Sequence, residues 1–151
     1  MTDLARILMV EDDPRDVELT LTALEENHLA NEVVVARDGT EALDYLKCRG
    51  RFADRPKGNP AVILLDLKLP KVNGVEVLEQ VRSDEQLKMI PVVVLTSSHE
   101  DKDMLASYRL GVNAYVVKPV DFHEFVTAVK ELGMFWAIIN QPPPGSAKKV
   151  S

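Results

Sequence analysis

The chain has 151 residues, of which 46% are hydrophobic and 28% charged, as expected for one globular domain. A net charge of −6 without a basic cluster argues against a nucleic-acid partner. No apolar stretch approaches the roughly 18 residues of a membrane helix, and no signal-peptide pattern is present, so we expect a cytoplasmic protein without a membrane partner.

Five short apolar runs punctuate the sequence, and each is continuous rather than alternating with polar residues. Continuous runs are typical of strands that are buried on both faces, as in a parallel sheet covered by helices. The runs span Ile7–Val10, Val33–Ala36, Ala61–Leu65, Val92–Leu95 and Ala114–Val117.

Amphipathic stretches separate these runs. The first begins at Pro14, which suits the first position of a helix because its missing N–H would be unpaired there. Others are indicated by apolar residues at helical spacing, namely Leu43 and Leu46, Leu78 and Val81 after Gly74, Leu105 and Tyr108, and Phe122 to Leu132. Strict alternation of strand and helix predicts an α/β fold with a parallel sheet.

Two segments depart from this alternation. The polar segment Gly50–Pro60 predicts a loop between a helix and the third strand. Residues 141–151 contain three consecutive prolines and little apolar material, so we expect an extended tail. We therefore expect one domain over residues 1–140, with its last helix extended to about residue 139, and no second domain.

Acids, hydroxyl residues or a lysine directly follow the first, third, fourth and fifth apolar runs. In open α/β sheets, ligands bind beyond the carboxyl ends of the strands. We therefore expect the side chains after the first, third, fourth and fifth runs to line one crevice: Glu11 with Asp12, Asp66, Thr96 and Lys118.

Three carboxylates at one place repel each other, because two unit charges about 4 Å apart cost about 4 kcal/mol at a dielectric constant near 20. A divalent cation relieves this repulsion, and ligand sets made only of oxygen suit Mg²⁺. A carboxylate can also act as a nucleophile and form an acyl phosphate. Phosphoryl transfer needs positioning and charge neutralisation, which Mg²⁺, Lys118 and the Thr96 hydroxyl could supply.

In this order and spacing, the motifs resemble the receiver domain of two-component response regulators. The resemblance rests on Ile7–Asp12, Asp66–Pro70 followed by Gly74, Val94–Ser97, and Lys118-Pro119, and it covers roughly Ala5 to Leu132. It implies a flavodoxin-like (βα)5 three-layer sandwich with strand order 2-1-3-4-5.

Three further features resemble the small stand-alone regulators that are paired with bacterial and cyanobacterial phytochromes. These are the loop Gly50–Pro60, the segment Ile90–His99 and the aromatic pair Phe135-Trp136. The resemblance implies a phosphohistidine on a sensor kinase, here of phytochrome type, as the phosphoryl donor.

The family also implies roles for the residues of the expected crevice. Asp66 would be the phospho-acceptor. Asp12, Asp66 and the main-chain carbonyl of Lys68 would ligate Mg²⁺, while Glu11 would hold a metal-bound water. Lys118 would pair with Asp66 and then with the phosphoryl oxygens.

A second group of implied roles concerns switching and output. Thr96 would move to hydrogen-bond the phosphoryl group, and Tyr115 would turn inward in response. The peptide bond between Lys118 and Pro119 would be cis. With no second domain expected, output would be protein contact or phosphorelay. A homodimer would form through the fourth helix, fifth strand and fifth helix with the C-terminal extension, using Tyr108, Tyr115, Phe135 and Trp136.

Three other functions deserve comparison. Phosphatases of the haloacid dehalogenase type also form an aspartyl phosphate, but they carry a second acid two residues later, where this chain has Lys68. A receiver domain that acts without phosphorylation would not need the full set of site residues. A flavin-binding protein would need a phosphate-cradling loop after the first strand, where Glu11 and Asp12 stand instead. We therefore expect a signalling protein and not an enzyme that acts on a separate substrate.

Overall fold

The computed structural model describes residues 3–26, 32–69, 72–96, 110–112 and 114–118, together with 123 and 127. Several predictions fall on residues outside this set. They are the helix expected around Leu105, the extension of the last helix to about residue 139, the interface residues Tyr108, Phe135 and Trp136, the cis peptide bond to Pro119, and the tail 141–151.

The five predicted strands form one parallel sheet in the order β2-β1-β3-β4-β5. The strands are β1 (Asp3–Val10), β2 (Glu32–Ala36), β3 (Pro60–Asp66), β4 (Val92–Thr96) and β5 (Ala114–Val117). This order confirms the flavodoxin-like arrangement that the family resemblance implied. β1 and β3 lie at the centre and β5 at one edge, so each central strand contacts two neighbours.

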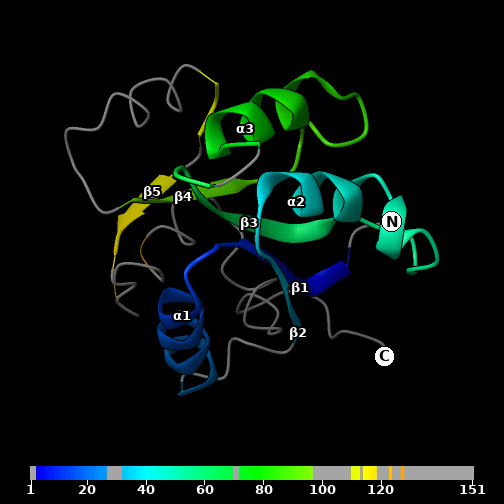
Figure 1. The fold of residues 1–151 in the computed structure, drawn as a ribbon. Helices are drawn as coiled ribbons and strands as arrows, with labels where there is room; N and C mark the ends of the chain where they lie inside the picture. Colours follow the sequence, from blue (N-terminus) through cyan, green and yellow to red (C-terminus); the bar gives the residue numbers. More distant parts are fainter. Residues whose placement is uncertain are drawn as a thin grey trace, which may run out of the picture.

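Helices cover both faces of the sheet. The helix α1 (Pro14–Glu26) lies on one face, while α2 (Gly39–Leu46) and α3 (Gly74–Ser83) lie on the other (Figure 1). His123 and Thr127 are also helical, and the Thr127 hydroxyl donates a hydrogen bond to the His123 carbonyl, 2.9 Å away and one turn earlier. None of the helices among the described residues has the length and apolar character needed to cross a membrane.

Alternate residues of the central strands pack on opposite faces. In β1, Ile7 and Met9 pack with Val17 and Leu24 of α1. Leu8 and Val10 face the other way and join a cluster with apolar residues of α2 and α3, including Leu43, Leu46, Val77 and Leu78. Because both faces of each central strand are buried, these strands need apolar residues at nearly every position, as the continuous runs predicted.

Capping residues start α2 and α3 at the carboxyl edge of the sheet. The side chain of Asp38 accepts a hydrogen bond of 2.8 Å from the backbone N–H of Glu41. Asn73 accepts one of 3.0 Å from Glu76. Each cap satisfies an N–H group that the helix itself leaves unpaired.

Gly74 brings the start of α3 against the end of β3. A Cβ atom at this position would lie 2.4 Å from the carbonyl oxygen of Asp66 and 2.5 Å from the Cα atom of Leu67. The Gly74 N–H donates a 2.9 Å hydrogen bond to the Leu67 carbonyl. Only glycine permits this approach, so the sequence at the helix start helps to fix the backbone that carries Asp66.

The predicted loop Gly50–Pro60 is more ordered than its composition indicated. Gly50–Phe52 form a short 3₁₀ helix, and Pro60 is already the first residue of β3, a strand position that proline tolerates. Tyr45 of α2 anchors the segment. Its ring packs edge-on against Phe52 at 5.1 Å, and the Arg55 guanidinium lies 4.0 Å from its centroid.

Arg55 also bonds to the main chain of α2 and to that of the segment itself. It donates hydrogen bonds of 2.7 Å to the Tyr45 carbonyl, 2.6 Å to the Pro56 carbonyl and 3.1 Å to the Gly58 carbonyl. The planar guanidinium therefore links α2 to the chain that enters β3.

Candidate functional site

The strand register brings the predicted site residues to one edge of the sheet. Val10 pairs with Leu65, so Glu11 and Asp12 follow β1 at the level where β3 ends in Asp66. Asp66 pairs with Leu95 of β4, and Thr96 pairs with Val117, the residue before Lys118. All of these positions lie at the carboxyl ends of parallel strands, the edge at which open α/β sheets bind their ligands.

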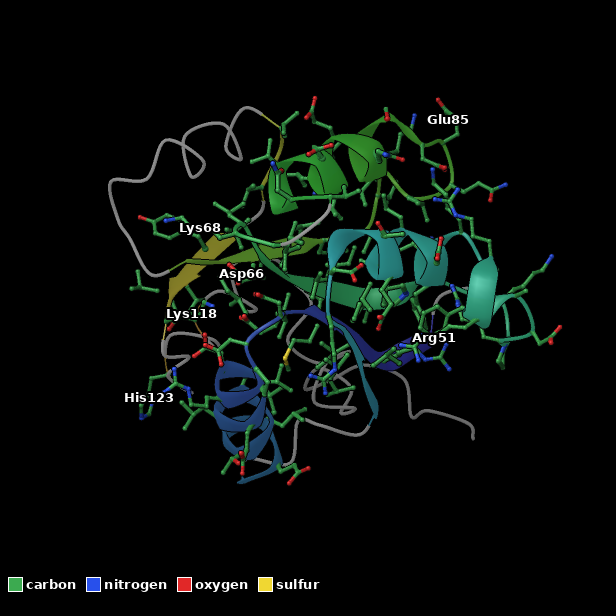
Figure 2. All side chains as sticks on the ribbon, viewed as in Figure 1. Arg51, Asp66, Lys68, Glu85, Lys118 and His123 are labelled. Carbon is green, nitrogen blue, oxygen red and sulfur yellow. The ribbon has the colours of Figure 1, made fainter. Side chains whose placement is uncertain are left out.

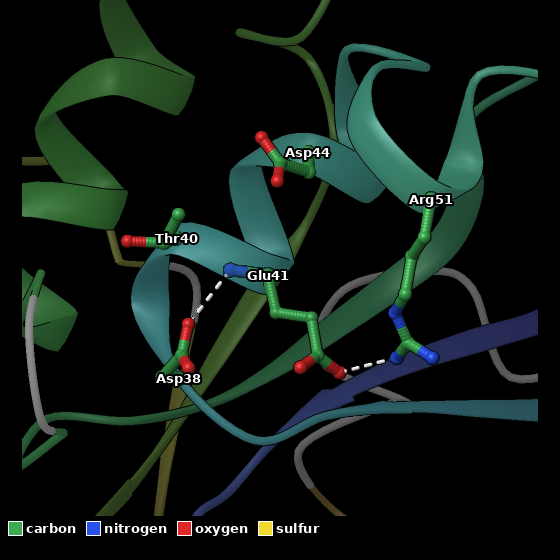
Figure 3. A pocket seen from close by; sticks show the side chains of 5 residues that line it. All are labelled: Asp38, Thr40, Glu41, Asp44 and Arg51. Carbon is green, nitrogen blue, oxygen red and sulfur yellow. Dashed lines mark hydrogen bonds and ion pairs between the residues drawn. The ribbon is translucent and has the colours of Figure 1, made fainter.

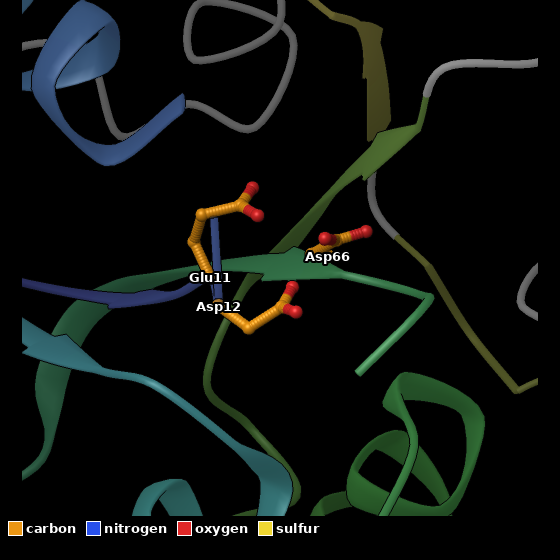
Figure 4. Close-up of side chains that lie close together, drawn as sticks. All are labelled: Glu11, Asp12 and Asp66. Atoms are coloured by element: carbon orange, nitrogen blue, oxygen red, sulfur yellow. The ribbon is translucent and has the colours of Figure 1, made fainter. Parts of the chain in front are cut away.

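Three carboxylates meet at this edge. Glu11, Asp12 and Asp66 each place one carboxylate oxygen within 4.8 Å of the others. Figure 4 shows the three side chains converging from the ends of β1 and β3. Glu11 and Asp66 are buried and Asp12 is exposed, so the cluster opens to solvent on one side.

Lys118 provides the positive charge of the site. Its Nζ atom lies 2.8 Å from Oε1 of Glu11, 2.9 Å from Oδ2 of Asp16 and 3.2 Å from Oδ2 of Asp66. Figure 2 shows Lys118 and Asp66 at the same end of the sheet. The ammonium offsets part of the repulsion among the carboxylates.

Backbone groups orient the two buried carboxylates. The N–H of Lys68 donates a 3.1 Å hydrogen bond to Oδ1 of Asp66, and the N–H of Asp13 donates a 3.2 Å bond to Oε2 of Glu11. The Glu11 main chain is tied to β2 by a 2.9 Å bond from its N–H to the Ala36 carbonyl. The two oxygens of Asp66 thus have different partners, a backbone N–H at Oδ1 and Lys118 at Oδ2.

The burial of Glu11 has a strong electrostatic effect. Loss of solvent raises the pKa of Glu11 to about 7; the hydrogen bond from Lys118 opposes this rise and the charge of Asp66 adds to it. For Lys118, burial alone lowers the pKa, but hydrogen bonds to Glu11 and Asp16 and the charge of Asp66 outweigh burial and raise it. Lys118 is therefore held in its charged form, while Glu11 holds a proton more readily than an exposed glutamate.

The donor set fits a hard divalent cation. It consists only of carboxylate oxygens, which are the ligands that Mg²⁺ and Mn²⁺ prefer. The cluster is open on the side of Asp12, which leaves room for waters or phosphoryl oxygens as further ligands. Glu11, Asp12 and Asp66 would hold such an ion, and it would neutralise negative charge next to the Asp66 carboxylate.

The other predicted residues are placed less completely. Thr96 is the last residue of β4, which puts its main chain at the same edge. Tyr115 lies on β5 opposite Val94 and is 37% exposed. Lys68 is exposed, two residues after the end of β3. The roles assigned to these residues, and to the acids and Lys118, stay predictions.

Two residues beside the cluster come from the start of α1. Asp13 accepts a 2.9 Å hydrogen bond at Oδ1 from the Arg15 N–H, which is the capping contact that its place before Pro14 favours. Asp16 contacts Lys118, and sequence reasoning missed it. The only available signal was an acid in the first turn of a helix that starts at the functional edge.

A separate surface pocket of about 290 Å³ lies over α2 (Figure 3). It is lined by Asp38, Thr40, Glu41, Asp44 and Arg51. The lining groups are largely engaged in structural contacts, because Asp38 caps α2 and Arg51 forms an ion pair with Glu41. This pocket is therefore not the candidate site.

Comparison with known proteins places residues 7–130 in a recognised family, the response regulator receiver domain. The curated relative "Response regulator Rcp1" of Synechocystis sp. is 40% identical over 86% of this chain and 87% of its own length. A solved structure of Rcp1 in its Mn²⁺-bound form matches with a TM-score of 0.71 at 39% identity, covering 88% of this chain and 94% of the other.

Two other solved structures that match this chain are those of phytochrome response regulators. The bacteriophytochrome response regulator AtBRR is 64% identical with a TM-score of 0.83, covering 91% of this chain and 98% of its own. The phosphorylated cyanobacterial phytochrome response regulator RcpA is 42% identical with a TM-score of 0.70, covering 87% and 93%.

Proposed function

The chain belongs to the response regulator receiver domain family and is related to phytochrome response regulators, and on this premise we propose that it is switched by transfer of a phosphoryl group to Asp66. The proposal rests on the charged groups that surround the Asp66 carboxylate. Asp66 is buried next to Glu11 and Asp12 and contacts the Lys118 ammonium at 3.2 Å. A buried carboxylate with both a cation and further acids beside it suits phosphoryl chemistry better than a structural role.

In the proposed reaction, a carboxylate oxygen of Asp66 attacks the phosphorus atom of a phosphohistidine. The new O–P bond forms as the P–N bond breaks, and its electron pair leaves with the imidazole of the donor, which takes up a proton. The product is a mixed carboxylic–phosphoric anhydride. Oδ1 of Asp66 is fixed by the Lys68 N–H and Oδ2 by Lys118, so the carboxylate is held in one orientation before the donor arrives.

Lys118 stabilises the transferred group. An ammonium 3.2 Å from Oδ2 is within reach of the oxygens of a phosphoryl group attached to Asp66. Charge neutralisation of this kind supplies much of the catalysis of phosphoryl transfer. The Thr96 hydroxyl, on the neighbouring strand, is the proposed second donor to the phosphoryl oxygens, and Tyr115 is the proposed aromatic switch on β5.

We further propose that Mg²⁺ is the bound ion. Asp12, Asp66 and the main-chain carbonyl of Lys68 would be its ligands, and Glu11 would hold a metal-bound water. The proposal is supported by the oxygen-only carboxylate set and by the Mn²⁺-bound form of the relative Rcp1. When bound, such an ion neutralises charge on the phosphoryl oxygens.

The proposed partner is a sensor histidine kinase linked to a phytochrome. Its support is the relation to phytochrome response regulators, one of which, RcpA, is known in a phosphorylated form. In this proposal the chain changes only its own phosphorylation state and does not turn over a separate substrate. Its output is contact with another protein, phosphorelay, or a homodimer through the face that includes Tyr115.

Acetyl phosphate with Mg²⁺ tests the proposal without the kinase. Intact-mass spectrometry should show one added phosphoryl group on the wild type and none on Asp66→Asn. Asp54→Asn, an exposed aspartate on the loop before β3, is the matched control and should be labelled like the wild type. Labelling of Asp66→Asn would assign the acceptor elsewhere, and continuous release of phosphate in many-fold excess over protein would favour a phosphatase.

A further inference from the structure

Asp16 is a charged residue at the site that no family role accounts for. It lies in the first turn of α1, and its Oδ2 atom is 2.9 Å from Nζ of Lys118. This distance is nearly as short as that between Lys118 and Glu11, 2.8 Å, and shorter than that between Lys118 and Asp66, 3.2 Å. Asp16 is thus a direct partner of the lysine and not merely a nearby charge.

The hydrogen-bonding capacity of Lys118 is used completely. A lysine ammonium has three N–H donors. Lys118 has three carboxylate partners, one each from Glu11, Asp16 and Asp66. Phosphorylation turns the Asp66 carboxylate into an acyl phosphate, so phosphoryl oxygens replace Oδ2 as acceptors for Lys118. A phosphoryl group carries more negative charge than the carboxylate and can accept more than one N–H group, so it competes with Glu11 and Asp16 for the ammonium.

The exposure of the carboxylates indicates whether Glu11 or Asp16 yields to the phosphoryl group. The Asp16 side chain is 29% exposed, compared with 1% for Glu11 and 8% for Asp66. Water can replace the ammonium at a partly exposed carboxylate, whereas a buried carboxylate without its partner is costly. The bond between Lys118 and Asp16 is therefore the least costly of the three to break.

We propose that Asp16 is a positioning residue that holds Lys118 toward α1 and competes with the phosphoryl group for it. The inference rests on the proposed function, since it deepens the account of the same site. In the unphosphorylated protein, Lys118 ties the end of β5 to the first turn of α1. Phosphorylation of Asp66 draws the ammonium away from Asp16 and releases this tie.

A simpler role for Asp16 leads to different expectations. An acidic residue in the first turn interacts favourably with the helix dipole, an effect of about 0.3–1 kcal/mol. If that were its whole contribution, replacing Asp16 would lower stability slightly and leave Lys118 unchanged. A test must therefore observe the lysine itself as well as phosphoryl binding.

The test compares Asp16→Asn with Glu18→Gln, which removes the same charge from an exposed position of the same helix. The ¹H–¹⁵N signal of the Lys118 ammonium, which is assigned by its loss in Lys118→Arg, reports the bond between Lys118 and Asp16 directly. We expect Asp16→Asn to shift this signal and speed its solvent exchange, and Glu18→Gln to leave it unchanged. Asp16→Glu, which keeps the charge, should restore part of the wild-type signal.

The second readout is affinity for beryllium fluoride, a phosphoryl analogue, in the presence of Mg²⁺. Removing the competitor should tighten its binding about three- to tenfold in Asp16→Asn, the range expected for one charge-assisted bond that is partly exposed to water. Glu18→Gln should bind it like the wild type.

The two proposals can fail separately. If acetyl phosphate does not label the wild type, the proposed function fails, while a shifted Lys118 signal in Asp16→Asn would still establish the tie. If Asp16→Asn shows a wild-type ammonium signal, or binds beryllium fluoride no more tightly than the Glu18→Gln control, the competition inferred for Asp16 is wrong.

Discussion

The Lys118 ammonium lies 2.8 Å from the Glu11 carboxylate, although 107 residues separate them in the chain. Glu11 is almost fully buried, and its charge has little solvent to stabilise it. The pair therefore links the electrostatics of the site to the stability of the fold.

Replacing Lys118 with methionine should destabilise the protein in the absence of divalent cations. The change keeps the aliphatic stem but leaves Glu11 and Asp66 without their cation, at a cost of about 1–3 kcal/mol. Urea denaturation at pH 8 measures the loss. Millimolar Mg²⁺ should recover more stability in Lys118→Met than in the wild type, because binding to the folded state alone stabilises it. An equal gain in both proteins would mean that lysine and cation do not share these carboxylates.

Metal-free stability should depend on pH through Glu11. Its pKa is about 7 in the folded protein, above the ordinary value of 4.5, so the folded state binds the proton more tightly than the unfolded chain. The resulting stabilisation is complete below pH 4.5 and is lost as the pH rises through 7. It amounts to at most about 3 kcal/mol.

The control for this pH effect is Glu11→Gln, which cannot titrate. The unfolding free energy of the wild type should fall relative to that of Glu11→Gln as the pH rises from 5 to 8. Urea melts at a series of pH values in a chelating buffer provide the measurement. A difference that is constant over this range would show that Glu11 does not hold the proton.

Substituting Gly74 with alanine should destabilise the protein, although alanine normally favours a helix by about 0.5–1 kcal/mol over glycine. The new Cβ atom would meet the Asp66 carbonyl oxygen at 2.4 Å, so the backbone must shift. Overpacking of this kind costs about 1–3 kcal/mol. Glu79→Ala, at an exposed position of the same helix, should be close to neutral. A stabilised Gly74→Ala would contradict the close approach.

Arg55→Ala should loosen the segment between α2 and β3. The guanidinium bonds to three carbonyls, at Tyr45, Pro56 and Gly58, and its loss should cost about 1–2 kcal/mol because those carbonyls lose their donors. Limited digestion with a nonspecific protease should cut residues 49–59 faster. Arg55→Lys keeps the charge but not the planar fork, so it should behave nearly like alanine. Wild-type resistance in Arg55→Lys would mean that charge alone holds the segment.

Much of the fold could be predicted because its local and global preferences agree. The run Ala61–Leu65 is apolar throughout, and the strand that contains it is buried throughout. Pro14 and Gly74 mark helix starts that the structure places at the same residues. Such signals are local, so they predict strands and helix starts without knowledge of what packs against these elements.

The contacts that were missed depend on long-range geometry. Asp16 in a first helical turn predicts only a favourable interaction with the helix dipole, and its bond to Lys118 depends on where β5 lies in the sheet. The short helix Gly50–Phe52 and the anchoring by Arg55 were also missed, because glycine, proline and charge predict a loop whatever its tertiary partners.

Lys118 follows β5, an edge strand whose only partner among the described strands is β4. Its neighbours Glu11 and Asp66 lie at the ends of β1 and β3, and each of these strands pairs with a strand on both sides. Transient fraying of the sheet at this margin would withdraw the lysine while the acids stay in place, since outer elements open more readily than inner ones. The rate of amide hydrogen exchange at β5 would then measure how often the acidic cluster loses Lys118 as its counter-ion, independently of any phosphoryl donor.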